Sequence, residues 1–99
     1  MNKLSISHDV SEITASVDAV VAKGGVAAVI SRKGDIVSNE NRSTKVLFSR
    51  PETDEQAMDI VEMLVRSGAV DLVVTDFVPS AAVMGNAKRT GTEIVLFHS

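Results

Sequence analysis

Short apolar runs alternate with longer amphipathic segments along the chain, which is the pattern of an α/β fold. Five apolar runs are predicted to be strands, at residues 4–7, 26–30, 46–48, 70–75 and 94–97. The run at 26–30 is continuously apolar, which is typical of a parallel strand buried on both faces. The pattern therefore predicts a three-layer α/β sandwich with a five-stranded, mostly parallel sheet. A four-stranded or ferredoxin-like arrangement is the alternative.

Three helices are predicted between these strands from capping residues and from apolar residues at helical spacing. Asp9 with Glu12 caps the first helix, Thr53 with Gln56 caps the second, and Ser80 opens a weaker third. One face of the first helix is apolar at Ile13, Val17, Val20 and Val21. The second helix has its apolar face at Ala57, Ile60, Val61 and Leu64. Strand–helix–strand units of this kind form parallel pairs with right-handed crossovers.

The composition fits one globular domain over residues 1–99, with 44% apolar and 23% charged residues. The lack of cysteine excludes disulfides, thiolate metal sites and a cysteine nucleophile. No apolar run approaches the roughly 18 residues of a membrane span, and no signal-like segment opens the chain. A soluble domain of cytoplasmic type is therefore predicted, or a purely recombinant one if the sequence is artificial. The net charge of −3 argues against a nucleic-acid partner.

Candidate chemistry gathers at the predicted carboxyl ends of the strands, where open parallel sheets bind their ligands. The polar residues that follow the strands there are His8, Asp9, Ser31, Arg32, Asp76 and His98. Two imidazoles and two carboxylates would suit a divalent metal, but no spacing such as H-x-x-x-H supports that hypothesis. We therefore predict no catalytic residue, no metal site and no cofactor. Asp76, His8 and Asp9 are weak candidates for cofactor binding, and the basic pairs Arg32-Lys33 and Lys88-Arg89 are interpreted as solvated surface.

The stretch from Leu47 to Asp76 resembles the ATPase core of the bacterial RecA recombinase family. Residues 49–57, SRPETDEQA, are similar to the family's SQPDTGEQA, and residues 64–71, LVRSGAVD, are close to the family's version letter for letter. Residues 72–76, LVVTD, look like the Walker B strand with its terminal aspartate. The resemblance implies a RecA-like, P-loop-type topology with strand order 3-2-4-5-1. It also implies that the parent family hydrolyses ATP.

The residues that carry ATP chemistry in that family are missing here. No glycine precedes Gly24 and no Gly-Lys-Ser/Thr occurs, so the loop and the lysine that hold phosphates are absent. Asp9 and Glu12 place negative charge where the phosphates would bind. Arg32 and Lys33 stand where the family has its catalytic glutamate. The family's N-terminal assembly helix and DNA-binding loops also have no counterpart in the chain.

Asp76 is the one catalytic-looking residue that remains, and the resemblance implies that it would hold Mg²⁺ through water. Without a P-loop we interpret it as an inherited carboxylate for which the sequence shows no compensating cation. Its replacement by asparagine is then predicted to be neutral or stabilising by up to about 1–2 kcal/mol. If Asp76 binds metal or caps the turn at Pro79-Ser80, the same change is predicted to destabilise.

The sequence therefore predicts a stably folding, RecA-core-like domain that is not an enzyme and has no small-molecule substrate. Capping and turn residues agree with the fold along nearly the whole chain. This agreement favours an artificial sequence on a RecA-type backbone over a degenerate natural relative. The alternatives are a degenerate nucleotide-binding, ATPase-like domain and an interaction module that mimics a RecA-type subunit. A regulatory domain similar to the sulfate-transporter and anti-sigma-antagonist type is a further alternative, and the oligomeric state stays open.

Overall fold

A computed structural model describes residues 4–7, 9–32 and 45–97 of the protein. In these ranges the elements are, in chain order, β1 (Leu4–Ser7), α1 (Val10–Ala22), β2 (Ala27–Ile30), β3 (Val46–Ser49), α2 (Asp54–Ser67), β4 (Leu72–Thr75), α3 (Ala81–Thr90) and β5 (Glu93–Phe97). The predicted α/β class with three helices is confirmed. The predicted loop after the second strand falls largely on residues 33–44, outside the described residues. None of the helices in the described ranges is long and apolar enough to cross a membrane.

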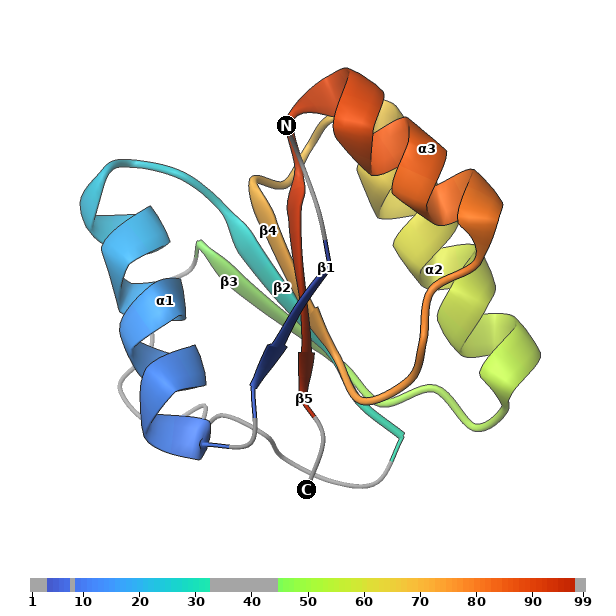
Figure 1. Ribbon diagram of the computed structural model, residues 1–99, viewed down its shortest axis with the longest axis horizontal. Coiled ribbons are helices and arrows are strands. Elements are labelled where there is room, and N and C mark those ends of the chain that lie inside the picture. Colours follow the sequence, from blue (N-terminus) through green and yellow to red (C-terminus); the bar gives the residue numbers. More distant parts are fainter. Residues whose placement is uncertain (1–3, 8, 33–44, 98–99) are drawn as a thin grey trace.

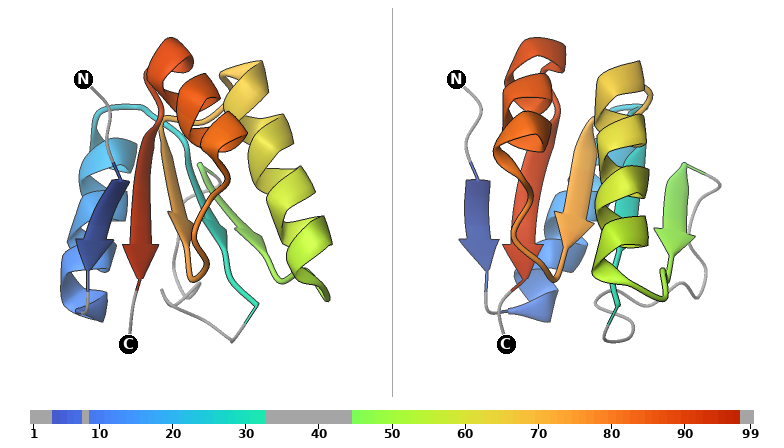
Figure 2. Two further views of the ribbon diagram at one scale, coloured as in Figure 1. Left: turned by 45° about the vertical axis from the view of Figure 1, so that its right-hand side comes forward. Right: turned by 90° about the vertical axis from the view of Figure 1, so that its right-hand side faces the viewer.

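The strands form one parallel sheet in the order β1-β5-β4-β2-β3, with β1 and β3 at its edges (Figure 1). Every strand pair in the described ranges is parallel, so the ferredoxin-like alternative, which mixes in antiparallel strands, is wrong. The order is the one that the family resemblance implies, with β5 inserted between β4 and β1. Helix α1 covers one face of the sheet, and α2 and α3 cover the other (Figure 2). Because all these strands run in the same direction, their carboxyl ends lie at the same end of the sheet.

Two apolar clusters hold the layers together, one on each face of the sheet. Successive side chains of a strand point to opposite faces, so Val73 joins one cluster and Val74 the other. The cluster under α1 comprises Ile13, Val17, Ala27, Val29, Val46, Leu72, Val74 and Val95. The cluster under α2 and α3 comprises Ala28, Ile30, Ala57, Val61, Val65, Val70, Val73, Val83, Ala87 and Ile94. Branched aliphatic side chains fill both clusters, as expected for a chain with three phenylalanines and no other aromatic residue.

Helix α2 buries a narrower stripe than its sequence pattern predicts. Ala57, Val61 and Val65 are 0% exposed and form a straight i, i+4, i+8 row against the sheet. Ile60 and Leu64 are only partly buried and pack at the margin of the same cluster. The prediction is therefore right for Ala57 and Val61, overstated for Ile60 and Leu64, and missed Val65.

The predicted helix starts are confirmed by side-chain caps. Asp9 Oδ1 accepts a hydrogen bond from the Ser11 N–H at 2.8 Å at the start of α1. Ser80 Oγ accepts one from the Val83 N–H at 3.2 Å at the start of α3. Such caps satisfy backbone donors that have no partner within the helix, and each contributes about 1 kcal/mol. The helix starts are therefore encoded by residues next to them in the sequence.

Two glycines offer a matched test of the packing. A Cβ on Gly25 would lie 2.7 Å from Asp71 Oδ2 and 2.9 Å from Val20 Cγ1, whereas a Cβ on Gly85 would meet nothing within 4 Å. We expect Gly25→Ala to destabilise by about 1–3 kcal/mol through overpacking. Gly85 lies inside α3, so Gly85→Ala is expected to stabilise by roughly 0.5–1 kcal/mol. Equilibrium urea unfolding checks both, and a shift of both variants in the same direction would contradict this packing.

Candidate functional site at the carboxyl ends of β2 and β4

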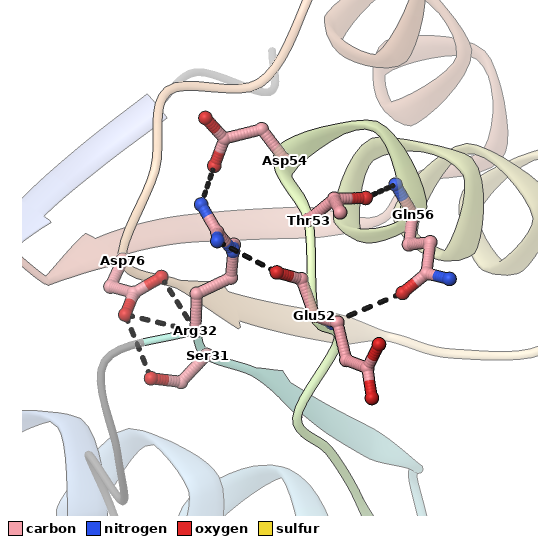
Figure 3. A network of polar contacts seen from close by, with 7 residues as sticks. All are labelled: Ser31, Arg32, Glu52, Thr53, Asp54, Gln56 and Asp76. Atoms are coloured by element: carbon pink, nitrogen blue, oxygen red, sulfur yellow. Dashed lines mark hydrogen bonds and ion pairs between the residues drawn. The ribbon is translucent and has the colours of Figure 1, made fainter.

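Asp76 is held by the end of the neighbouring strand. β2 and β4 pair with Ile30 aligned to Thr75, so Ser31 and Asp76 leave the sheet side by side. The Ser31 hydroxyl donates to Asp76 Oδ2 at 2.8 Å. The Arg32 N–H lies 3.2 Å from Oδ1 and 3.1 Å from Oδ2 of the same carboxylate (Figure 3). These donors supply the compensation for the Asp76 charge that the sequence alone does not reveal.

Arg32 continues the network toward α2. Its Nη1 donates to Asp54 Oδ1 at 2.6 Å, and its Nη2 donates to the Glu52 carbonyl oxygen at 2.8 Å (Figure 3). Arg32 is exposed, as its interpretation as solvated surface implies, but that interpretation is incomplete because Arg32 also joins the end of β2 to the first turn of α2. The Asp54 side chain is 79% exposed, so this ion pair adds little stability on its own and mainly positions the guanidinium.

The start of α2 is fixed by its own polar contacts. Thr53 Oγ1 accepts from the Gln56 N–H at 3.1 Å, and Gln56 Oε1 accepts from the Glu52 N–H at 3.1 Å. The first bond is the one that the predicted capping box requires, whereas in the second Gln56 accepts from the Glu52 N–H, one residue before the N–H of Thr53 that a capping box would use. Together the two bonds hold the Glu52 carbonyl and Asp54 where the Arg32 guanidinium reaches both (Figure 3).

A partly open cavity of about 400 Å³ lies at this junction and is lined by Arg32, Asp54, Asp76 and Phe77. The volume falls in the range of small-molecule sites. Its three charged side chains are already engaged with one another or with neighbouring backbone. Within residues 4–7, 9–32 and 45–97, no group of three or more histidine, aspartate or glutamate side chains could hold a metal ion. The Arg32 guanidinium pairs with Asp54, and the Asp76 carboxylate accepts from uncharged donors of the chain.

The structure separates the predicted site residues into two places. Ser31, Arg32 and Asp76 come together at the ends of β2 and β4. Asp9 is exposed and caps α1 after β1. It is separated from Asp76 because β5 lies between β1 and β4 in the sheet. His8, Lys33 and His98 lie outside the described residues. The predicted surface pair Lys88-Arg89 is exposed at the end of α3.

Asp54 is the site residue that sequence reasoning missed. A signal for it was present, because Asp54 follows the Thr53 cap at the start of a helix entered from a strand. The amino end of such a helix lies at the same edge of the sheet as the carboxyl ends of the strands.

Comparison with known proteins gives the family. The model of the RecA N-terminal domain matches residues 7–93 of the chain. Protein RecA 1 of Myxococcus xanthus is 46% identical over 77 residues, which cover 73% of this chain and 22% of that protein. Protein RecA of Nocardia farcinica is 43% identical over 75 residues, covering 71% of this chain and 21% of the relative. The chain thus spans about a fifth of the length of the curated relatives it matches. With the RecA-like strand order and the match over residues 7–93, the chain belongs to the RecA N-terminal domain family.

Proposed function

We propose that this chain is a RecA-type domain without nucleotide chemistry, in which the network around Asp76 is a structural junction. The observation that supports this proposal is the set of donors around the Asp76 carboxylate, namely the Ser31 hydroxyl at 2.8 Å and the Arg32 N–H. A carboxylate at the end of a buried strand needs such donors to remain charged without a large energetic cost. The chain supplies them from β2 and has no need of a bound ion for that purpose.

The junction ties together three segments that are distant in the sequence. Asp76 follows β4, Ser31 and Arg32 follow β2, and the Arg32 guanidinium reaches Glu52 and Asp54 at the start of α2. In this proposal the junction holds the ends of β2 and β4 and the start of α2 in place. The proposed domain is not an enzyme. The net charge of −3 supports a domain with no nucleic-acid partner. The proposal holds for a natural and for an artificial history of the sequence.

A titration with Mg²⁺-ATP tests this proposal against nucleotide binding. We expect the amide resonances of residues 9–14, 31–32 and 76–77 to stay unchanged at millimolar nucleotide. The reason is that the chain has no Gly-Lys-Ser/Thr motif, so it lacks the glycine-rich loop and its lysine that hold phosphates. Asp9 and Glu12 would also repel the phosphates. Isotope-labelled protein and two-dimensional NMR give the measurement, with Mg²⁺ alone as the control. Saturable shifts confined to these residues would contradict the proposal and favour a degenerate nucleotide-binding domain.

A further inference from the structure

A second aspartate stands at the opposite end of β4 from Asp76. Asp71 directly precedes β4, and its Oδ2 accepts a hydrogen bond from the Val26 N–H at 3.0 Å. Asp76 directly follows β4, and its two carboxylate oxygens lie 3.2 and 3.1 Å from the Arg32 N–H (Figure 3). Each carboxylate therefore meets a backbone donor just outside β2, one before the strand and one after it.

Both donors lie on the side of β2 that faces β4. Alternate N–H groups of a strand point to the same neighbouring strand. The Ala27 N–H donates to the Lys45 carbonyl oxygen at 3.0 Å, toward β3, so the even-numbered residues of this segment donate toward β4. Val26 and Arg32 flank that row of donors, and a side chain beside β4 satisfies each of them.

The apolar side chains of β2 and β4 leave the register of the two strands open. All four residues of each strand are buried, because helices cover both faces of the sheet. A strand with one polar face resists slipping, since a slip exposes its apolar side chains, but a strand buried on both faces lacks that safeguard. A slip by two residues would also keep every side chain on its own face. The apolar pattern alone therefore does not select the observed alignment of Ala28 with Val73.

Gly25 is an independent sign that the Asp71 carboxylate has a fixed place. A Cβ on Gly25 would lie 2.7 Å from Asp71 Oδ2, closer than side chains normally approach. The residue before the Val26 donor thus leaves open the space that the carboxylate occupies. The Asp71 N–H in turn donates to the Val26 carbonyl oxygen at 2.8 Å, so two hydrogen bonds join these residues.

We propose that Asp71 and Asp76 form two clamps, each a carboxylate with its backbone donor beside β2, that fix the register of β2 against β4. Val26 and Asp71 are 45 positions apart in the sequence, and so are Ser31 and Asp76. Aligned residues of the two strands have the same offset, so a slip of either strand breaks both clamps at once. The part played by Asp76 rests on the proposed structural junction, whereas the part played by Asp71 does not.

Nuclear magnetic resonance of the isotope-labelled protein tests the register directly. Contacts between backbone protons of adjacent strands are expected to identify Val73 as the neighbour of Ala28 in the parent. Each clamp is expected to favour this register by about fivefold, so Asp71→Ala and Asp76→Ala together raise the slipped fraction by about 25-fold. Saturation-transfer measurements on the double variant are expected to detect a minor form whose shifted resonances concentrate in β2 and β4. A folded double variant with a single register would overturn the proposal.

Hydrogen exchange of the Val26 amide tests the Asp71 clamp alone and does not require the double variant to fold. Asp71→Ala is expected to speed this exchange by about fivefold, because the amide loses its acceptor. Asp71→Asn is expected to retain most of the protection, since its amide oxygen can still accept this single bond. Asp59→Ala is the matched control, because Asp59 is exposed on α2 outside both clamps. Equal exchange at Val26 in Asp71→Ala and Asp59→Ala would overturn the role of Asp71.

The two proposals fail in different experiments. Saturable shifts at Asp76 on adding Mg²⁺-ATP would contradict the structural junction but leave the Asp71 clamp standing. An unchanged Val26 amide in Asp71→Ala would overturn the paired clamps but leave the hydrogen bonds of Ser31 and Arg32 to Asp76 as a junction.

Discussion

Replacing Ile13 with alanine is expected to lower the free energy of unfolding by about 2–5 kcal/mol. Ile13 is 1% exposed, and with Val17 it forms the buried side of α1, the helix that covers its face of the sheet. Truncation removes apolar contact and leaves a cavity in the cluster that also contains Leu72 and Val74. Domains of this size are stable by about 5–15 kcal/mol, so this loss is a large share of the total. Equilibrium urea unfolding followed by circular dichroism measures it.

Val10→Ala is the matched control on the same helix. Val10 is 44% exposed, so its truncation is expected to change the free energy of unfolding by no more than about 0.5 kcal/mol. A loss below about 1 kcal/mol for Ile13→Ala would mean that α1 does not pack on the sheet through this side chain. Equal losses for the two variants would also contradict the packing, because they would show that burial does not distinguish the positions.

Asp76→Asn is expected to destabilise the domain by about 1–3 kcal/mol, in the opposite direction to the expectation from sequence. Both oxygens of the Asp76 carboxylate accept from the Arg32 N–H, and Oδ2 also accepts from the Ser31 hydroxyl. Asparagine offers one oxygen and turns an NH₂ group toward donors. The variant therefore loses hydrogen bonds and leaves a partly buried donor without an acceptor. Urea unfolding of the parent and the variant gives the difference.

A double-mutant cycle separates this structural role from metal binding. Ser31→Ala alone is expected to cost about 1 kcal/mol, and the double variant is expected to cost less than the sum of the two single changes, since they share one hydrogen bond. The cost of Asp76→Asn is expected to be the same with EDTA and with Mg²⁺. A loss above roughly 1 kcal/mol that appears only with Mg²⁺ would show a bound ion and contradict the structural junction.

Local signals in the chain were sufficient to predict the helices and most strand positions. Thr53 and Ser80 cap helices through bonds to residues only three positions away, and Gly68 and Gly91 end helices with φ values of 69° and 79°. These interactions act within a single turn, so the sequence pattern records them directly. The parallel sheet was predictable for a similar reason, because the strand–helix–strand units restrict how the strands can pair.

The tertiary structure alone decided which distant polar groups meet. Ser31 and Asp76 are 45 positions apart, and Arg32 and Asp54 are 22 apart. Their contacts depend on the alignment of Ile30 with Thr75 and on the position of the first turn of α2 relative to the sheet. The spacing of residues along the sequence reveals neither of these. The same holds for α2, where Val65 is fully buried and Leu64 only partly. The spacing of apolar residues shows only which broad side of a helix is buried. Which residues on that side lie closest to the sheet is set by packing against the strands and against α3.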